Sequence, residues 1–259
     1  MSMNIKPVIL TSIQMRRLHK LEELLIESKK ILGLEKENIE VGISGKNSAF
    51  LHWYEKGKKW GIYLLPSDND FTPIHELGHI FLAKETNYIY FARSGIKSDK
   101  IFEGLLLILN HLLDCFVDYN LIQFKGLYEL YIDDAHLWNG AKQKSKIIGK
   151  PIDLVHSYKT LIGYYLCLKI IDKEKNRTYF IGIKNYLRRA KKLIQKTFPN
   201  IKFNFQSLEE KLDHFDKIKD TKDPEKIINF FYNILYEISL WKETDVQKQM
   251  KLLFPNVSQ

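Results

Sequence analysis

The sequence predicts an α+β protein: a helix, a small antiparallel sheet and two further helices, followed by a mainly helical C-terminal half. Three observations support this fold class. Apolar residues recur at helical spacing near the N-terminus and again over most of the chain beyond Gly126. Three short segments of strand character lie between these regions, separated by turn-prone residues. The composition, 45% hydrophobic and 27% charged, is that of a folded globular chain.

Helices account for most of the predicted structure. The first covers residues 12–32 and ends at Gly33. Its apolar positions are Ile13, Leu18, Leu21, Leu24, Leu25 and Ile31. The second begins with Thr72 as N-cap and Pro73 at the first helical position, and a long apolar helix follows over residues 100–122. In the C-terminal half, periodic segments predict helices at residues 153–171, 184–198, 209–218, 224–240 and 245–253.

The three predicted strands cover residues 39–43, 49–54 and 60–65. The segments between them, residues 44–47 and 56–58, consist of Ser, Gly, Lys and Asn, which favour turns. We therefore expect the strands to form a small antiparallel meander.

Charge, cysteine content and hydropathy limit the possible binding partners and cellular compartment of the protein. The net charge of +9 permits contact with nucleic acid or anionic surfaces but says nothing about the fold. Cys115 and Cys167 lie in apolar helical segments, which predicts reduced core thiols in a cytoplasmic protein. The N-terminal residues lack the apolar core of a secretory signal. The most apolar stretch, residues 101–122, contains three acidic residues, so we expect a buried helix and no membrane span.

Residues 75–79 read His-Glu-Leu-Gly-His within the second predicted helix. Residues four apart on a helix lie one above the other, so His75 and His79 point the same way. Two imidazole nitrogens can then reach one zinc ion at roughly 2.0–2.1 Å. Glu76 lies about 100° further round the helix. A general base at that position would take a proton from an attacking water.

A zinc site needs at least a third protein ligand, and the helix over residues 100–122 offers candidates. Its other faces are apolar, but one stripe is polar and acidic, and a buried acidic stripe is unfavourable unless it faces a cation. The stripe consists of Glu103, Asn110, Asp114 and Asp118, with His111 at its border. A solvated stripe, or one paired with the basic C-terminal half, is the alternative.

The His-Glu-x-x-His segment, followed by a second helix bearing a carboxylate, resembles the zincin superfamily of zinc-dependent metallopeptidases. The run from Asn110 to Asp118 is similar to the N-x-x-x-D helix of several prokaryotic zincin-like proteins. This resemblance covers about residues 60–122. It implies an active-site helix that follows a small sheet, a third ligand from the second helix, and an edge strand at residues 60–65 that pairs with an extended peptide substrate.

The sequence departs from the better-known zincin subfamilies. His79 is not followed by the further histidine of the metzincins, and no Gly-Thr-x-Asp segment supports the aspzincins. The site is gluzincin-like with an acidic third ligand, although the strict Glu-x-x-x-Asp pattern is absent because Leu107 follows Glu103 by four positions. Asp114 ranks first as third ligand, and Asp118 and Glu103 remain alternatives. A carboxylate that does not bind the ion would orient His75 or His79 through the free ring nitrogen, a role that also suits Asn110.

These residues predict a cytoplasmic zinc metallopeptidase that hydrolyses peptide bonds in a peptide or protein substrate. Zn²⁺ is held by His75, His79 and Asp114, and Glu76 is the general base. Residues 1–145 form the zincin-like region, and residues 146–259 form a helical region packed on it as one unit. Two alternatives remain: a catalytically idle zincin-fold protein that acts as a regulatory or interaction module, and a nucleic-acid-binding protein that uses the basic C-terminal half.

Further polar residues have weaker support. The segment from Asp133 to His136 resembles a metal-binding cluster, but aspartates there more often cap a helix. Zincins also use a tyrosine or histidine from a distant element to stabilise the oxyanion. The candidates for that role are His156, Tyr158, Tyr164 and Tyr165, and the sequence does not select among them.

Overall fold

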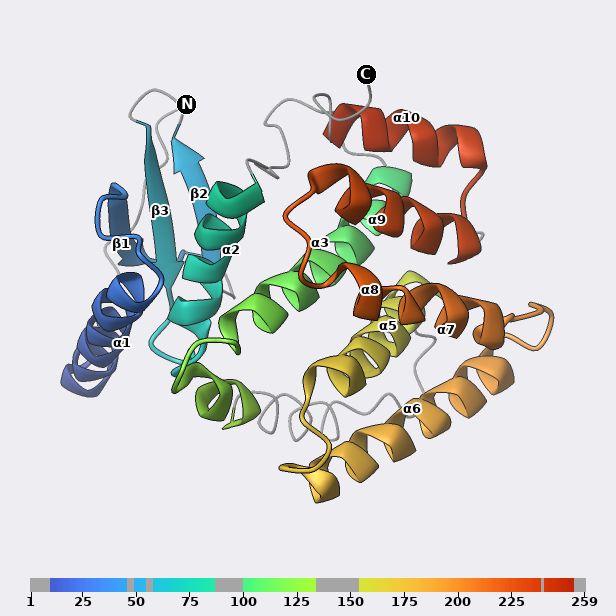
Figure 1. Ribbon diagram of the computed structural model, residues 1–259, viewed down its shortest axis with the longest axis horizontal. Coiled ribbons are helices and arrows are strands. Elements are labelled where there is room, and N and C mark those ends of the chain that lie inside the picture. The colour runs from blue at the N-terminus through green and yellow to red at the C-terminus, as the bar shows by residue number, and fades with distance from the viewer. Residues whose placement is uncertain are drawn as a thin grey trace.

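The computed structural model describes residues 10–45, 49–54, 58–86, 100–133, 154–238 and 240–253. In these residues the protein is α+β and mainly helical, with a three-stranded mixed sheet. Figure 1 shows the sheet at one end of the molecule with α1 (Ser12–Ile31) and α2 (Thr72–Thr86) beside it. The long helix α3 (Lys100–Leu121) lies between α2 and the C-terminal helices. The predicted α+β class is confirmed.

The sheet contains β1 (Ile39–Ile43), β2 (Phe50–Tyr54) and β3 (Lys59–Leu64) in the order β1-β3-β2. β3 pairs antiparallel with β2 and parallel with β1. The predicted antiparallel meander is therefore wrong, and so is the expectation that residues 60–65 form an edge strand.

The two faces of the sheet differ in what covers them. Ile62 and Leu64 of β3 are fully buried, and α2 packs against the sheet. On the opposite face the ring of Tyr63 lies over two glycines of the sheet. A Cβ at Gly42 would meet the Tyr63 ring at 2.8 Å, and one at Gly61 would meet it at 2.9 Å. Only glycine leaves room for the tyrosine ring at these positions.

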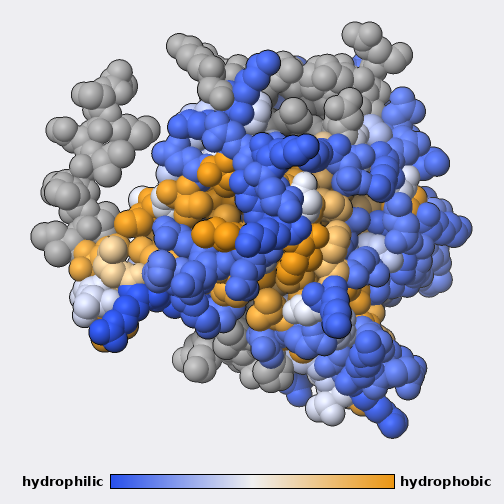
Figure 2. Space-filling model, turned by 60° about the vertical axis from the view of Figure 1, so that its left-hand side comes forward, coloured by the Kyte–Doolittle hydropathy of each residue, from blue (hydrophilic) through white to orange (hydrophobic). Residues whose placement is uncertain are grey.

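Helix α1 begins and ends as the sequence predicts. Thr11 caps it in a capping box with Gln14, and Gly33, with a φ of 66°, follows its end. Leu18, Leu21 and Leu25 are buried as expected. Ile13 and Ile31 were expected on the same buried face, but they are 77% and 45% exposed because both lie about 110° round the helix from the buried leucines. Figure 2 shows apolar side chains lying between polar ones on this side of the molecule.

The start of α2 is fixed by residues that the sequence analysis did not select. The Asn69 side-chain oxygen accepts hydrogen bonds from the backbone N–H groups of Phe71 and Thr72, both at 2.9 Å. Asn69 therefore takes the capping role that was expected of Thr72. The neighbouring Asp70 forms salt bridges with Arg17 and Lys20 of α1, which ties the loop before α2 to the first helix.

The C-terminal half is helical, as predicted. Its helices are α5 (Leu154–Ile170), α6 (Arg177–Thr197), α7 (Phe205–Asp213), α8 (Phe215–Ile218), α9 (Pro224–Ile238) and α10 (Glu243–Leu253). The largest differences from the predictions lie in α6, α7 and α8. α6 begins seven residues earlier than expected at residue 184, and the predicted helix 209–218 is divided at His214.

One hydrophobic core runs through the described residues of both predicted regions. Its centre is α3, which packs against α2, α5 and α9 and whose Ile108, Leu112 and Phe116 are fully buried. Residues 103–121 are long and apolar enough to span a membrane by composition alone. Of this window 56% is buried inside the fold, as in the core helix of a soluble protein. The predicted boundary at residues 145–146 lies outside the described residues.

Candidate metal centre

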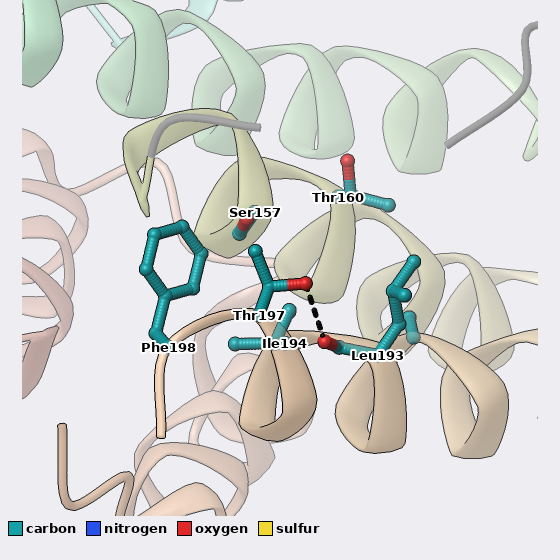
Figure 3. Close-up of a pocket in the computed structure, with 7 residues that line it drawn as sticks. Ser157, Thr160, Leu193, Ile194, Thr197 and Phe198 are labelled. Atoms are coloured by element: carbon teal, nitrogen blue, oxygen red, sulfur yellow. Dashed lines mark hydrogen bonds between the residues drawn. The ribbon is translucent and has the colours of Figure 1, made fainter. Parts of the chain in front are cut away.

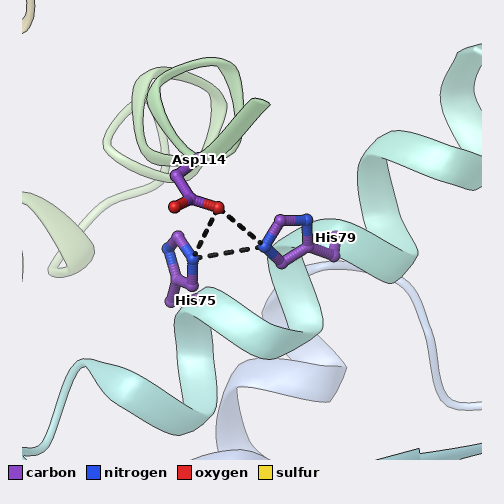
Figure 4. Close-up of side chains that lie close together, drawn as sticks. All are labelled: His75, His79 and Asp114. Carbon is purple, nitrogen blue, oxygen red and sulfur yellow. Dashed lines mark hydrogen bonds and ion pairs between the residues drawn. The ribbon is translucent and has the colours of Figure 1, made fainter. Parts of the chain in front are cut away.

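The candidate site lies where α2 crosses α3. His75 and His79 lie one helical turn apart on α2 and project toward α3, and Asp114 of α3 points back at them (Figure 4). The side chains of the two histidines are 21% and 20% exposed and that of Asp114 is 36% exposed. The site is therefore half-buried at the helix interface and open to solvent on one side.

The three side chains converge through single atoms. The Nε2 atoms of His75 and His79 are 3.2 Å apart. The Oδ1 atom of Asp114 lies 3.6 Å from His75 Nε2 and 3.4 Å from His79 Nε2. The structure thus brings together the three residues predicted as metal ligands.

This triangle fits a tetrahedral metal ion. Ligand atoms of tetrahedral zinc at roughly 2.0–2.1 Å from the metal are about 3.3 Å from one another. The three observed separations, 3.2, 3.4 and 3.6 Å, lie on either side of that value. Two imidazole nitrogens and a carboxylate oxygen also suit zinc, and the fourth position remains for water or substrate. The residues present therefore fit a catalytic zinc ion.

Asp118, one turn after Asp114, contacts the other nitrogen of His75. Its Oδ1 atom lies 2.7 Å from His75 Nδ1. A proton on Nδ1 donates to this carboxylate and leaves the Nε2 lone pair for a metal. Asp118, an alternative third ligand in the sequence, is thus placed by the structure in the orienting role.

Without a bound metal, the charges of the site shift the pKa values of His75 and Asp114. Burial favours neutral His75, but the nearby charges of Asp118 and Asp114 outweigh it and raise the pKa of His75 well above 6.5. Burial likewise favours neutral Asp114, yet hydrogen bonds from His75 and His79 hold the pKa of Asp114 far below its usual range. Because the pKa of His75 is raised, a metal ion that binds these three atoms would compete with a proton for His75.

Glu76 lies between the two histidines in sequence and is 9% exposed. Burial raises the pKa of Glu76, and the charges of His79 and His75 oppose this shift only in part. A carboxylate with raised proton affinity, next to a site that could hold zinc, has the properties of a general base.

Gly78 sets the distance between the two helices of the site. A Cβ at this position would lie 2.5 Å from Val117 Cγ1 and 2.7 Å from Leu121 Cδ1 of α3. These separations are far below van der Waals contact, so only glycine permits the observed approach of α2 to α3. The residue therefore keeps Asp114 within reach of both histidines.

Three residues near the site did not receive a role from the sequence. His111 Nδ1 lies 4.0 Å from Asp114 Oδ2, on the side of the carboxylate away from the α2 histidines. The ring of Phe71 lies 6.3 Å from that of His75, and buried Tyr131 packs edge-on against Phe71. Phe71 could have been found from its spacing, because it precedes His75 by four positions at the start of α2, where the N–H of His75 donates to the Phe71 carbonyl.

The remaining candidates lie elsewhere. Glu103 and Asn110 are exposed on α3, and of the candidates for the orienting role it is the carboxylate of Asp118 that contacts His75. His156 is exposed, Tyr165 donates to Asp213, and Tyr158 and Tyr164 are buried. Asp133 is exposed, and the other residues of its cluster, 134–136, lie outside the described residues.

A second hollow lies between α5 and α6 (Figure 3). Two of its three hydroxyls bond to carbonyls of their own helices: Thr197 donates to Leu193 and Thr160 to His156. The lining residues are Ser157, Thr160, Ala190, Leu193, Ile194, Thr197 and Phe198. The described residues of this lining include no acid or base that could activate a hydroxyl, so they lack the groups of a hydrolytic site.

Comparisons of the chain with protein-family models, curated proteins and solved structures find no match. The function is therefore inferred from the residues and their geometry.

Proposed function

We propose that the protein is a cytoplasmic zinc-dependent metallopeptidase of the zincin type. The supporting observation is the convergence of His75 Nε2, His79 Nε2 and Asp114 Oδ1 at separations of 3.2–3.6 Å beside buried Glu76. His75, His79 and Asp114 would supply the three ligands of a zinc site. Glu76, within the same turn of α2 as the two histidines, would supply the base. The peptide substrate follows from the resemblance to zincins.

The chain's residues divide the work of hydrolysis among them. A zinc ion at this site would polarise the scissile carbonyl and lower the pKa of the attacking water. Glu76, whose pKa is raised by burial, accepts the proton of that water and can pass it to the departing amine. Asp118 holds His75 in the tautomer and orientation that keep Nε2 directed at the triangle. Each of these roles requires α2 and α3 to remain in contact.

An extended substrate has an available sheet edge. β3 is hydrogen-bonded on both sides, so the strand next to α2 in sequence cannot accept a peptide. β2 pairs with β3 on one side, is an edge of the described sheet, and also contacts α2. A substrate strand would therefore add to β2, through main-chain hydrogen bonds.

The free cysteines support the cytoplasmic location. Cys115 and Cys167 are both buried and unbridged, and both belong to the one hydrophobic core. Burial also raises the pKa of Cys115 well above its usual range, which keeps it a protonated thiol. Such cysteines are typical of a reducing compartment.

Substitution of Glu76 by Gln tests the proposal. The purified protein should contain one zinc per chain and should cleave members of a quenched-fluorescent peptide library. Glu76→Gln should keep the zinc and lose the cleavage, because the amide cannot accept the proton of the attacking water. Glu85→Gln is the matched control: it removes an exposed carboxylate from the same helix, whose partner is Lys222.

The other outcomes separate the alternatives. A zinc content near zero in the wild-type protein, or cleavage by Glu76→Gln at the wild-type rate, would overturn the proposal. One zinc per chain without cleavage of any library member would favour the catalytically idle metal-binding module. His75→Ala should lose the metal under either alternative.

A further inference from the structure

Helix α6 carries charge of one sign only. Its 21 residues contain seven lysines and arginines and no acidic residue: Arg177, Lys184, Arg188, Arg189, Lys191, Lys192 and Lys196. Six of the seven are exposed. At 100° per residue all seven fall within about 160° of the helix circumference, opposite buried Ile183, Leu187 and Ile194. The basic face is therefore continuous along a rod about 30 Å long.

The concentration of positive charge on α6 is not explained by the lysine content of the chain as a whole. The chain has a net charge of +9, and α6 alone contributes +7 of it. Three of the six arginines of the whole sequence lie in this helix. Other surface helices mix the two signs: α1 has five lysines and arginines and three glutamates, and α10 has two basic and two acidic residues.

The basic side chains of α6 have little internal compensation. Within the described part of the chain, the salt bridge from Lys191 to Glu209 is the one ion pair that they make. Arg188 reaches only the amide of Asn185, at 3.5 Å. Cations this close repel one another unless an external anion is present. Arginine is also the side chain that best matches phosphate geometry.

We propose that the exposed face of α6 binds the phosphate backbone of a double-stranded nucleic acid. The six exposed cations, spread along about 30 Å of helix, complement a duplex, which carries a negative charge for every 1.7 Å or so of its axis. Tyr179 and Tyr186 are partly buried, so the basic face does not offer the stacking aromatics that single strands require. Contacts of this kind position a duplex without reading its sequence.

A membrane surface fits these observations less well. A helix that lies in a lipid interface inserts its apolar face, but the apolar face of α6 is packed on α5. On the exposed side Ile181 is the large apolar side chain, and cations lie around it. α6 also lies at the opposite end of the molecule from the sheet and α2, so duplex binding is separable from the metal site (Figure 1).

The test is fluorescence anisotropy of the full chain with a labelled DNA duplex of about 20 base pairs, two helical turns. Wild-type protein should bind with an affinity that falls steeply with salt. Arg189→Ala/Lys192→Ala/Lys196→Ala should lower the salt slope by up to about 2.7, and the affinity at 0.1 M salt by at least tenfold and up to roughly 500-fold. Circular dichroism would confirm that this variant is folded.

The matched control removes the same charge from another helix end. Lys242→Ala/Lys248→Ala/Lys251→Ala affects exposed lysines at or next to α10, and its duplex affinity should stay within about threefold of wild type. Equal losses in both triple variants would show that only net charge matters and would overturn the proposal. Absence of duplex binding at low salt would overturn it too, as would binding only to equimolar phosphatidylserine–phosphatidylcholine vesicles. An RNA duplex of the same sequence, measured in parallel, distinguishes the two sources of the backbone, and binding of either duplex supports the proposal.

Discussion

The substitution Gly78→Ala tests whether the contact between α2 and α3 creates the metal site. The added Cβ would lie 2.5 Å from Val117 Cγ1, where an ordinary contact is about 3.5–4.0 Å, so the helices must separate by roughly 1 Å. Overpacking of this kind typically costs about 1–3 kcal/mol. Metal-free protein relieves this strain by letting the helices part.

Metal binding has to bring the two helices together again. Asp114 Oδ1 now lies 3.4 and 3.6 Å from the two histidine nitrogens, and a further 1 Å would take it beyond the reach of one tetrahedral ion. If all of the strain is restored on binding, 1–3 kcal/mol corresponds to a roughly 5- to 150-fold loss of zinc affinity. Competition titration with a chromogenic zinc chelator measures this loss.

Two further variants make the test specific. Gly182→Ala on α6 has no atom within 4 Å of its added methyl, so it should leave zinc affinity unchanged and should not destabilise the protein. Val117→Ala combined with Gly78→Ala removes the stiffest contact and should recover part of the affinity. Zinc binding by Gly78→Ala equal to that of the wild type would refute the account of the helix contact.

Two other predictions concern the groups around His75. Asp118→Asn should weaken zinc binding roughly 10- to 100-fold, because an amide no longer fixes the orientation of the His75 imidazole. The control Asp133→Asn, at an exposed position, should leave zinc affinity unchanged. Equal affinities of the two variants in chelator titrations would contradict the orienting role of Asp118. In metal-free protein the raised pKa of His75 means that its ion pairs contribute fully below the unfolded-state value near 6.5 and are lost as the pH rises through the folded-state pKa. The thermal midpoint should therefore fall toward alkaline pH, and His75→Gln should remove most of this slope; a variant with the wild-type slope would show that other groups cause it.

The positions of helices could be predicted because burial imposes a period on the sequence. α1 and α3 begin and end within one residue of the expected limits, since one or more faces of each are apolar over their whole length. Strand pairing could not be predicted in the same way. Residues 39–43 have the same alternation whether they pair with β2 or with β3, and only the tertiary contact decides.

In the candidate metal site, the residues of one helix could be placed from the sequence, but the ligand from the second helix could not. His75, Glu76 and His79 belong to one helix, so their relative geometry follows from the sequence alone. Which residue becomes the third ligand depends on the position of α3 along its axis relative to α2. Glu103 and Asp114 share the acidic stripe but are separated by about 16 Å along the helix axis. The contact of Gly78 with Val117 fixes this relative position. It places Asp114 at the histidines and leaves Glu103 exposed.

Under the proposed function, the central position of α3 would couple the stability of the whole protein to zinc binding. α3 supplies Asp114 and Asp118 to the site, and its Phe116 packs against Phe215 and Phe230 of the C-terminal helices. A ligand that binds only the folded chain stabilises it by about 2.7 kcal/mol at one hundred times its dissociation constant. That is a large share of the roughly 5–15 kcal/mol that hold a domain together. In a zinc-starved cell the whole chain, and not only its site, would be exposed to degradation more often.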